Sequence, residues 1–238
     1  MSDPFLLVHG SAHGAWCWDH LVPALAARGR DAIAIDLPGH GPADRTRAAD
    51  VTLDDYAEAI IEAADRPVVL VGHSMAGFPI TLAAERAPER FSGLIYLCAH
   101  VPIAGKSIVD MRELVGPSPL TEAIRPAEDG RTLTIDPDMA PGKFYHDCPA
   151  DLARWATNHL CPQPVAPQTT PFPLPLSNSL KMPRHYIRCM EDRAIPPAYQ
   201  VDRTRDWVGG EVVEMQTSHS PFLSDPAALA NHLIRLAP

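Results

Sequence analysis

Three residues that lie far apart in the chain have the types required for nucleophilic attack on a carbonyl group: Ser74, Asp192 and His219. A serine hydroxyl becomes a strong nucleophile when an imidazole accepts its proton, and a carboxylate orients that imidazole and stabilises its charged form. The three residues occur in the order serine, acid, histidine, which is one of the orders known for such triads. The sequence therefore predicts Ser74 as nucleophile, His219 as general base and acid, and Asp192 as the orienting group.

The sequence around Ser74 is typical of a sharp turn between a strand and a helix. The apolar run Val68 to Val71 leads into Gly72-His73-Ser74-Met75-Ala76-Gly77, and a helical pattern follows. A nucleophile elbow needs small residues two positions before and after the serine, because strand and helix approach closely there. Gly72 meets this need, whereas Ala76 departs from the usual glycine and is followed at once by Gly77. The alternative is a serine that only caps the helix.

A glycine-rich segment after the first apolar run predicts an oxyanion hole. The run ends in His9-Gly10-Ser11-Ala12-His13-Gly14, where the backbone can pass close to a substrate carbonyl. In acyl transfer, two backbone N–H groups bind the oxyanion, one from such a loop and one from the residue after the nucleophile. We expect these donors to be the amides of Ser11 and Met75, and the dipole of the helix that starts near Met75 also favours negative charge.

The acid and the histidine each follow a predicted strand. The strand His185 to Met190 ends in Glu191 and Asp192, and the strand Glu211 to Gln216 ends in Thr217-Ser218-His219. Asp192 is favoured over Glu191 because the acid belongs in the loop past the strand end. Only His219 among the eleven histidines has the required place in the chain order.

Short apolar runs alternate with longer segments of helical periodicity, which is the pattern of a parallel sheet covered by helices on both faces. About six strands are predicted, near Phe5 to His9, Asp31 to Leu37, Pro67 to Gly72, Gly93 to Ala99, His185 to Met190 and Glu211 to Gln216. Helices are predicted near Ala15 to Arg28, Leu53 to Ala64, Met75 to Arg86, Pro197 to Trp207 and Pro226 to Leu236. The fold class is α/β, and the strand order 2-1-3-4-5-6 of the α/β-hydrolase fold would bring Ser74 to the crevice where the order reverses.

The stretch Val101 to Pro183 breaks this alternation. It is rich in proline, most densely from Pro162 to Pro175, where helix and central strand are both disfavoured. It also holds apolar anchors, at Phe144, Tyr145, Trp155 and Leu160. We therefore predict a lid inserted at residues 101–183 into a core of residues 1–100 and 184–238; the alternative is a long surface excursion without a role.

Composition excludes several classes of protein. The chain has 238 residues, 46% hydrophobic residues and a formal net charge of −9, so a sequence-independent nucleic-acid binder is not expected. The N-terminus lacks the basic start of a signal peptide, and the first apolar run is too short to span a bilayer. These features predict a cytoplasmic protein without a membrane partner.

No metal and no cofactor is expected. Five cysteines form an odd set without a C-x-x-C pair, which favours reduced thiols over a disulfide framework or a zinc site. The spacing of His9, His13 and His20 matches no ligand motif, so packing is the favoured role for these side chains. The oligomeric state stays open, with a homodimer among the alternatives.

Several segments together resemble the plant methylesterase and hydroxynitrile lyase branch of the α/β-hydrolases. The similar segments are Phe5 to Trp16, the Gly72 to Gly77 turn, Glu191-Asp192 and His219, and Phe144 to Leu152 in the insertion. The resemblance covers most of the chain. It implies a cofactor-free enzyme that hydrolyses small carboxylic esters, notably methyl esters, or cleaves cyanohydrins, with the triad at Ser74, Asp192 and His219.

The resemblance also separates these two activities. Lyases of the branch that use a lysine carry it directly after the catalytic histidine, with a threonine after the first-strand histidine; this chain has Ser220 and Gly10 there. A second lyase type uses an asparagine in the oxyanion loop, which Gly10 and Ser11 do not supply. Gly10, His100 and Ser220 are expected at the substrate, and His100 replaces the apolar or aromatic residue of the family's acyl pocket.

The sequence thus predicts a serine hydrolase that cleaves small carboxylic esters, methyl esters among them, through an acyl-enzyme. Two alternatives remain at this point: a hydroxynitrile lyase on the same site, and a non-catalytic protein that binds a small molecule under the lid.

Overall fold

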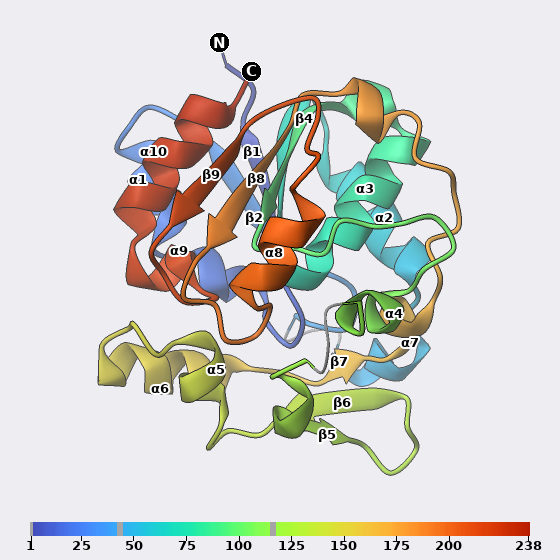
Figure 1. The fold of residues 1–238 in the computed structure, drawn as a ribbon, viewed down its shortest axis with the longest axis vertical. Coiled ribbons are helices and arrows are strands. Elements are labelled where there is room, and N and C mark those ends of the chain that lie inside the picture. Colours follow the sequence, from blue (N-terminus) through green and yellow to red (C-terminus); the bar gives the residue numbers. More distant parts are fainter. Residues whose placement is uncertain (1, 42–44, 115–117) are drawn as a thin grey trace.

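A six-stranded parallel sheet forms the centre of the computed structural model, which describes residues 2–41, 45–114 and 118–238 (Figure 1). The strand order is β2-β1-β3-β4-β8-β9, which confirms the predicted order 2-1-3-4-5-6. The strands are β1 (Phe5–Val8), β2 (Ala32–Ile35), β3 (Val68–His73), β4 (Phe91–Leu97), β8 (Arg184–Cys189) and β9 (Val212–Met215). Each lies within two residues of a predicted strand.

Helices cover both faces of this sheet (Figure 1). The α-helices of the described residues are α1 (Leu21–Ala26), α2 (Leu53–Ala63), α3 (Gly77–Arg86), α4 (Ile108–Arg112), α5 (Ala140–Phe144), α6 (Ala150–His159), α7 (Ala166–Thr169), α8 (Pro197–Arg203), α9 (Pro221–Ser224) and α10 (Pro226–Leu236). Helices α1 and α10 lie on one face, and α2 and α3 on the other (Figure 1).

The central strands are apolar on both sides because both sides are covered. Successive residues of a strand point to opposite faces, and in β1 they enter different apolar clusters. Phe5 and Leu7 pack in the cluster that contains residues of α1 and α10, whereas Leu6 and Val8 pack with residues of α2 and α3. The unbroken apolar runs in the sequence therefore correspond to two cores, one on each side of the sheet.

The predicted helix at Ala15 to Arg28 is wrong in its extent. The structure has a 3₁₀ helix at Ala15–Trp18 and a separate α1 at Leu21–Ala26. Pro23 explains the break, since proline lacks an N–H and clashes with the preceding turn unless it lies in the first turn of a helix. The helix must therefore restart shortly before Pro23.

Two predicted helix starts have the expected caps. Thr52 accepts a hydrogen bond from the Asp55 amide, and the Asp55 side chain reaches back to the Thr52 amide, which makes a capping box at α2. Asp225 accepts from the Ala228 amide, with Pro226 at the first position of α10.

Helices α4 to α7 of the insertion lie across the carboxyl edge of the main sheet, and the segment after α7 runs along the side of the sheet to the start of β8 (Figure 1). The insertion also contains a three-stranded antiparallel sheet made of β5 (Ile124–Pro126), β6 (Thr132–Ile135) and β7 (Gln163–Pro164). Even the proline-rich stretch has regular structure, because Pro164 lies in an edge strand and Pro167 in the first turn of α7, where no N–H is needed. Phe144 and Tyr145 are buried in the same cluster as core strand residues.

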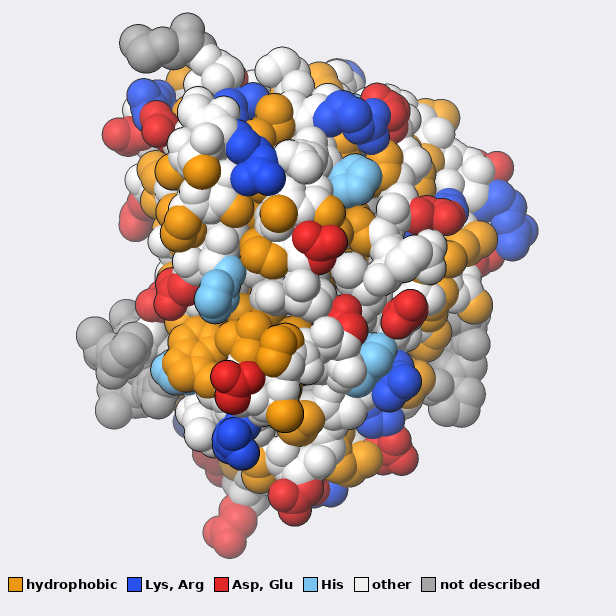
Figure 2. Space-filling view, turned by 90° about the vertical axis from the view of Figure 1, so that its left-hand side faces the viewer, with side chains coloured by type: hydrophobic (Ala, Val, Ile, Leu, Met, Phe, Trp, Pro, Cys, Tyr) orange, Lys and Arg blue, Asp and Glu red, His pale blue; other side chains and the backbone are white. Residues whose placement is uncertain are grey.

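Figure 2 shows the face of the molecule that carries α1 and α10. Among the residues the structure describes, Lys and Arg side chains on this face are interspersed with Asp and Glu and form no continuous basic band. Within residues 2–41, 45–114 and 118–238, no helix has both the length and the apolarity to cross a bilayer.

We predict that Gly77→Ala destabilises the fold. A Cβ atom at residue 77 would lie 2.0 Å from the carbonyl oxygen of His100, so the loop after β4 would have to move. The free energy of unfolding in urea should fall by about 1–3 kcal/mol. The matched control is Gly142→Ala in α5, where a Cβ meets nothing within 4 Å and stability should be unchanged or slightly raised. Equal stabilities of the two variants would contradict the prediction.

Candidate active site

Ser74 occupies a strained turn at the end of β3. Its φ angle is +57°, in the left-handed region that residues other than glycine rarely adopt. The His100 amide donates to the Ser74 carbonyl oxygen at 3.0 Å and holds the turn from the next strand. A Cβ atom at Gly72 would lie 2.7 Å from Ile80 Cδ1 and 3.0 Å from the Ala76 carbonyl oxygen. The close approach predicted from the small residues around Ser74 is therefore present.

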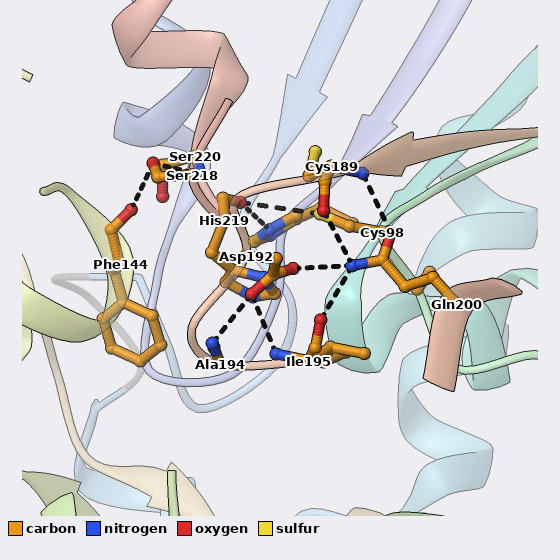
Figure 3. Close-up of polar contacts among 12 residues, drawn as sticks. Cys98, Phe144, Cys189, Asp192, Ala194, Ile195, Gln200, Ser218, His219 and Ser220 are labelled. Carbon is orange, nitrogen blue, oxygen red and sulfur yellow. Dashed lines mark hydrogen bonds and ion pairs between the residues drawn. The ribbon is translucent and has the colours of Figure 1, made fainter. Parts of the chain in front are cut away.

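His219 and Asp192 form a buried pair past the ends of β9 and β8. His219 Nδ1 lies 2.7 Å from Asp192 Oδ2, and both side chains are almost fully buried (Figure 3). Asp192 also accepts from the amides of Ala194 and Ile195 at 2.7 and 2.8 Å and from Gln200 Nε2 at 3.0 Å. With the carboxylate fixed in this way, the Nδ1 proton of His219 points to Asp192 and Nε2 is the ring nitrogen left for proton transfer.

The neighbouring acid does not take this position. The Glu191 side chain is 54% exposed and its carboxylate lies 4.0 Å from His146 Nε2. The structure thus places Asp192, and not Glu191, against His219.

Ser74 and His219 line one cavity. Its lining residues are Ser11, Ser74, His100, Arg112, Ser118, Leu120, Phe144, Ala194, Ile195, Pro196, Tyr199 and His219. Among the described residues, no hydrogen bond joins Ser74 to His219. In enzymes without substrate such bonds are often long and shorten only when substrate binds.

The two expected oxyanion donors come from the first loop, which contains Ser11, and from the serine turn itself, which contains Met75. A Cβ atom at Gly10 would lie 2.8 Å from Ser74 Cβ, so the first loop passes as close to the nucleophile as glycine permits. Ser11 lines the cavity, and its Oγ accepts a hydrogen bond from Gln168 Nε2 at 3.0 Å. Met75 is buried in the 3₁₀ helix Ser74–Ala76 that leads into α3.

The three residues expected at the substrate are placed differently. His100 lines the cavity, and its Nδ1 lies 2.9 Å from the Tyr199 hydroxyl. Burial, with smaller contributions from the charges of Arg112 and His219, lowers the pKa of His100 well below its usual value, so this imidazole is neutral. Gly10 borders Ser74 through its backbone. Ser220 is fully buried, and its side chain does not line the cavity.

His73, Cys98 and His219 bring potential metal ligands within 4.8 Å of one another. These groups have other partners in the structure. His73 Nε2 lies 2.9 Å and Cys98 Sγ 3.5 Å from the His219 carbonyl oxygen, while His219 Nδ1 is bonded to Asp192. Burial also raises the pKa of the Cys98 thiol strongly, which disfavours the thiolate that binds metals. The cluster holds the backbone of His219 in place.

Comparison with known proteins identifies the family, because the model of the alpha/beta hydrolase family matches residues 5–232. The chain belongs to the alpha/beta hydrolase family. It is 30% identical to a pyrethroid hydrolase of Sphingobium wenxiniae over 98% of this chain and 86% of that protein. It is also 30% identical to methylesterase 1 of Arabidopsis thaliana, over 98% and 95% of the two chains.

A solved structure shows the same similarity. The crystal structure of a pyrethroid hydrolase from Sphingobium faniae has a TM-score of 0.89 to this chain and 29% identity, and the match covers 99% of this chain and 97% of that one. These findings confirm the predicted fold and the methylesterase branch, and they make this chain a carboxylesterase-type hydrolase. Ester hydrolysis is favoured over both alternatives.

The sequence did not predict three residues that hold or line the site of this hydrolase: Gln200, Gln168 and Arg112. Gln200 bonds both Asp192 and the backbone of the Asp192 loop, and Gln168 bonds Ser11. Arg112 lines the cavity. The two glutamines lie in short helices that have proline in the first turn. In such short helices the sequence has no periodicity that would show whether a glutamine side chain points inward or to solvent.

Buried histidines should make this hydrolase unstable in acid. Burial lowers the pKa values of His9 and His13 to about 4 and about 3, and those of His73 and His100 well below the usual value. In the unfolded chain each of these histidines binds a proton near pH 6.5, whereas in the folded protein it stays neutral to a lower pH. A fall in pH below about 6.5 therefore favours the unfolded chain, and the full stability is present only above about pH 6.5. The free energy of unfolding should decrease by about 1.4 kcal/mol per pH unit for each histidine between about pH 6 and 4.

Urea titrations at several pH values measure this slope. The control is His20→Asn, which changes an exposed histidine and should leave the slope as it is. A free energy of unfolding that does not change from about pH 7 to 4.5 would contradict the account.

Proposed function

We propose that this enzyme hydrolyses small carboxylic esters, methyl esters among them, through an acyl-enzyme on Ser74. The observation that carries the proposal is the His219–Asp192 pair at 2.7 Å, which shares a cavity with the strained Ser74. The relatives named methylesterase and pyrethroid hydrolase support ester hydrolysis, and the first name supports methyl esters as one substrate class.

Acylation begins when Ser74 Oγ attacks the ester carbonyl carbon and His219 Nε2 accepts the hydroxyl proton. Asp192 stabilises the imidazolium that forms. The carbonyl oxygen becomes an oxyanion, which the amides of Ser11 and Met75 bind. The bond to the alcohol oxygen then breaks, and His219 returns its proton to the departing alcohol.

Deacylation repeats these steps with water. His219 Nε2 takes a proton from a water molecule, the water oxygen attacks the acyl carbon, and the same two amides bind the second oxyanion. Collapse releases the carboxylic acid and returns the proton to Ser74. No step in this sequence requires a metal or a cofactor.

The residues give no support to lyase chemistry. Gly10 and Ser220 stand where the lysine-dependent lyases of the branch carry threonine and lysine, and Ser220 is fully buried. A purely binding function is disfavoured because it would need neither the Asp192–His219 pair nor the strained backbone of Ser74.

We place the enzyme in the cytoplasm. All five cysteines are free thiols in the structure, and free thiols persist in a reducing compartment. A small ester is its proposed partner.

Replacing the nucleophile tests the proposal. Ser74→Ala should reduce the turnover of p-nitrophenyl acetate by a factor on the order of 10⁶, because removing a triad serine removes the acyl-enzyme route. A fluorophosphonate should label the parent enzyme covalently and fail to label the variant. The control is Ser92→Ala on β4, whose hydroxyl has no hydrogen-bond partner in the structure and whose loss should leave the rate unchanged. Parent-level turnover by Ser74→Ala would refute the assignment.

A further inference from the structure

We propose that Arg112 binds a carboxylate on the acid portion of the substrate, so that the preferred substrates are half-esters of small dicarboxylic acids. This inference rests on the proposed ester hydrolysis at Ser74 and specifies its substrate class.

Arg112 is the only Lys, Arg, Asp or Glu side chain among the described residues that line the Ser74 cavity. The other lining residues near it are neutral: Ser118, Leu120, Tyr199 and the neutral imidazole of His100. A single cation in an otherwise uncharged pocket selects for negative charge on the bound molecule.

Among the described residues, no carboxylate lies within 4.0 Å of the Arg112 guanidinium, so its charge has no counterion in that part of the chain. Burial lowers the pKa of Arg112 to about 10, so the side chain still carries its charge at neutral pH. Arg112 is partly exposed, and a charge that is partly removed from water is stabilised by a nearby charge of opposite sign. A substrate carboxylate would supply the missing partner.

The guanidinium is held in place and keeps donors for a ligand. Arg112 ends α4, which starts with a capping box at Ser107 and buries Ile108 and Met111. Its NH2 group donates to Gln168 Oε1 at 2.7 Å, and no hydrogen bond among the described residues uses Nε or NH1. Guanidinium donors in this fork geometry match the two oxygens of a carboxylate.

The position of Arg112 favours the acid portion over the alcohol portion of the substrate. The alcohol oxygen must lie beside His219, which protonates it. Arg112 instead connects through Gln168 to Ser11 Oγ, on the loop expected to hold the carbonyl oxygen. The chain that extends from the carbonyl carbon away from His219 would therefore reach the guanidinium.

Arg112 also lines a second pocket, which adjoins the Ser74 cavity. Arg112 and Ser118 line both spaces, and the outer one is bounded by residues of the lid, among them Thr121, Val165 and the exposed Glu113. A substrate that enters through the outer hollow would pass the guanidinium before reaching Ser74.

The test compares half-esters with matching diesters. We would measure kcat/KM for the monomethyl and dimethyl esters of succinate, glutarate and adipate. The parent enzyme should prefer at least one half-ester over its diester by tenfold or more, and Arg112→Gln should lose about 10- to 100-fold on that half-ester while diester turnover stays within about threefold. Arg112→Lys should keep part of the preference, since it keeps the charge but not the fork.

Two controls separate the specific effect from a general one. Lys106→Gln removes an exposed positive charge six residues before Arg112 in the sequence and should not change the preference. The second control is acetoxyacetate, an ester that carries its carboxylate on the alcohol portion. It should be a poor substrate. A parent enzyme that favours diesters or acetoxyacetate, or an Arg112→Gln variant that loses half-ester and diester turnover alike, would overturn the proposal.

A binding measurement keeps this proposal distinct from the esterase assignment. The free dicarboxylic acid of the best half-ester should inhibit p-nitrophenyl acetate hydrolysis by the parent, and Arg112→Gln should weaken this inhibition at least about tenfold. Failure of the parent to cleave any ester or to react with a fluorophosphonate would refute the proposed function. Diester cleavage and labelling without half-ester preference would refute only the role of Arg112.

Discussion

The left-handed backbone of Ser74 is the constraint on which the rest of the site depends. A serine with a φ angle of +57° is unfavourable in isolation and persists only where its surroundings fix it. Three backbone approaches do so here: Gly10 lies against the serine, Gly72 lies under the start of α3, and Gly77 lies against the loop after β4. Each approach leaves no room for a Cβ atom. The strand order that brings β1 and β4 to either side of β3 therefore fixes the turn that places Ser74 at the cavity.

The surroundings of the serine turn keep several buried imidazoles neutral and stabilise the charge of one carboxylate. Burial makes the imidazoles of His9, His13, His73 and His100 poor bases. One of them, His73, packs against His219 with 4.5 Å between the ring centroids. The carboxylate of Asp192 has the opposite environment, with backbone and Gln200 donors as well as His219. Proton transfer is thereby confined to one imidazole.

The sequence predicts most of this arrangement, because the strongest signals in it are local. Apolar runs of a few residues predict the six strands, and their order follows from the turn chemistry around Ser74 together with the resemblance to a known family. The chain order of the triad types then selects Asp192 and His219. The limits of the helices depend on single prolines such as Pro23, and so the helix predicted from Ala15 to Arg28 is too long.

Apart from His100, most side chains of the substrate pocket could not be predicted, for a different physical reason. Arg112 and Tyr199 reach the cavity from α4 and α8, and Gln168 reaches the adjoining hollow from α7. These three helices are far apart in the sequence. Which side of a five-residue helix faces inward is decided by packing with distant segments, and a helix this short has little periodicity to reveal it. Ser220 shows the converse, since its place beside His219 in the sequence does not bring its side chain to the cavity.

Two side chains of the inserted segment, residues 101–183, form hydrogen bonds with the loop that is proposed to bind the oxyanion. The side chain of Gln168, from the lid, donates to Ser11 Oγ and accepts from Arg112, so a single amide joins the proposed charge-binding group to the loop that holds the carbonyl oxygen. Gln163, also in the lid, accepts from the Ala12 amide in the same loop at 3.0 Å. A change in the lid that moves either glutamine would therefore alter the position of the Ser11 amide as well as the shape of the pocket. The proposed substrate selection and the proposed oxyanion binding would therefore be coupled, since both would depend on where residues 101–183 hold one short loop.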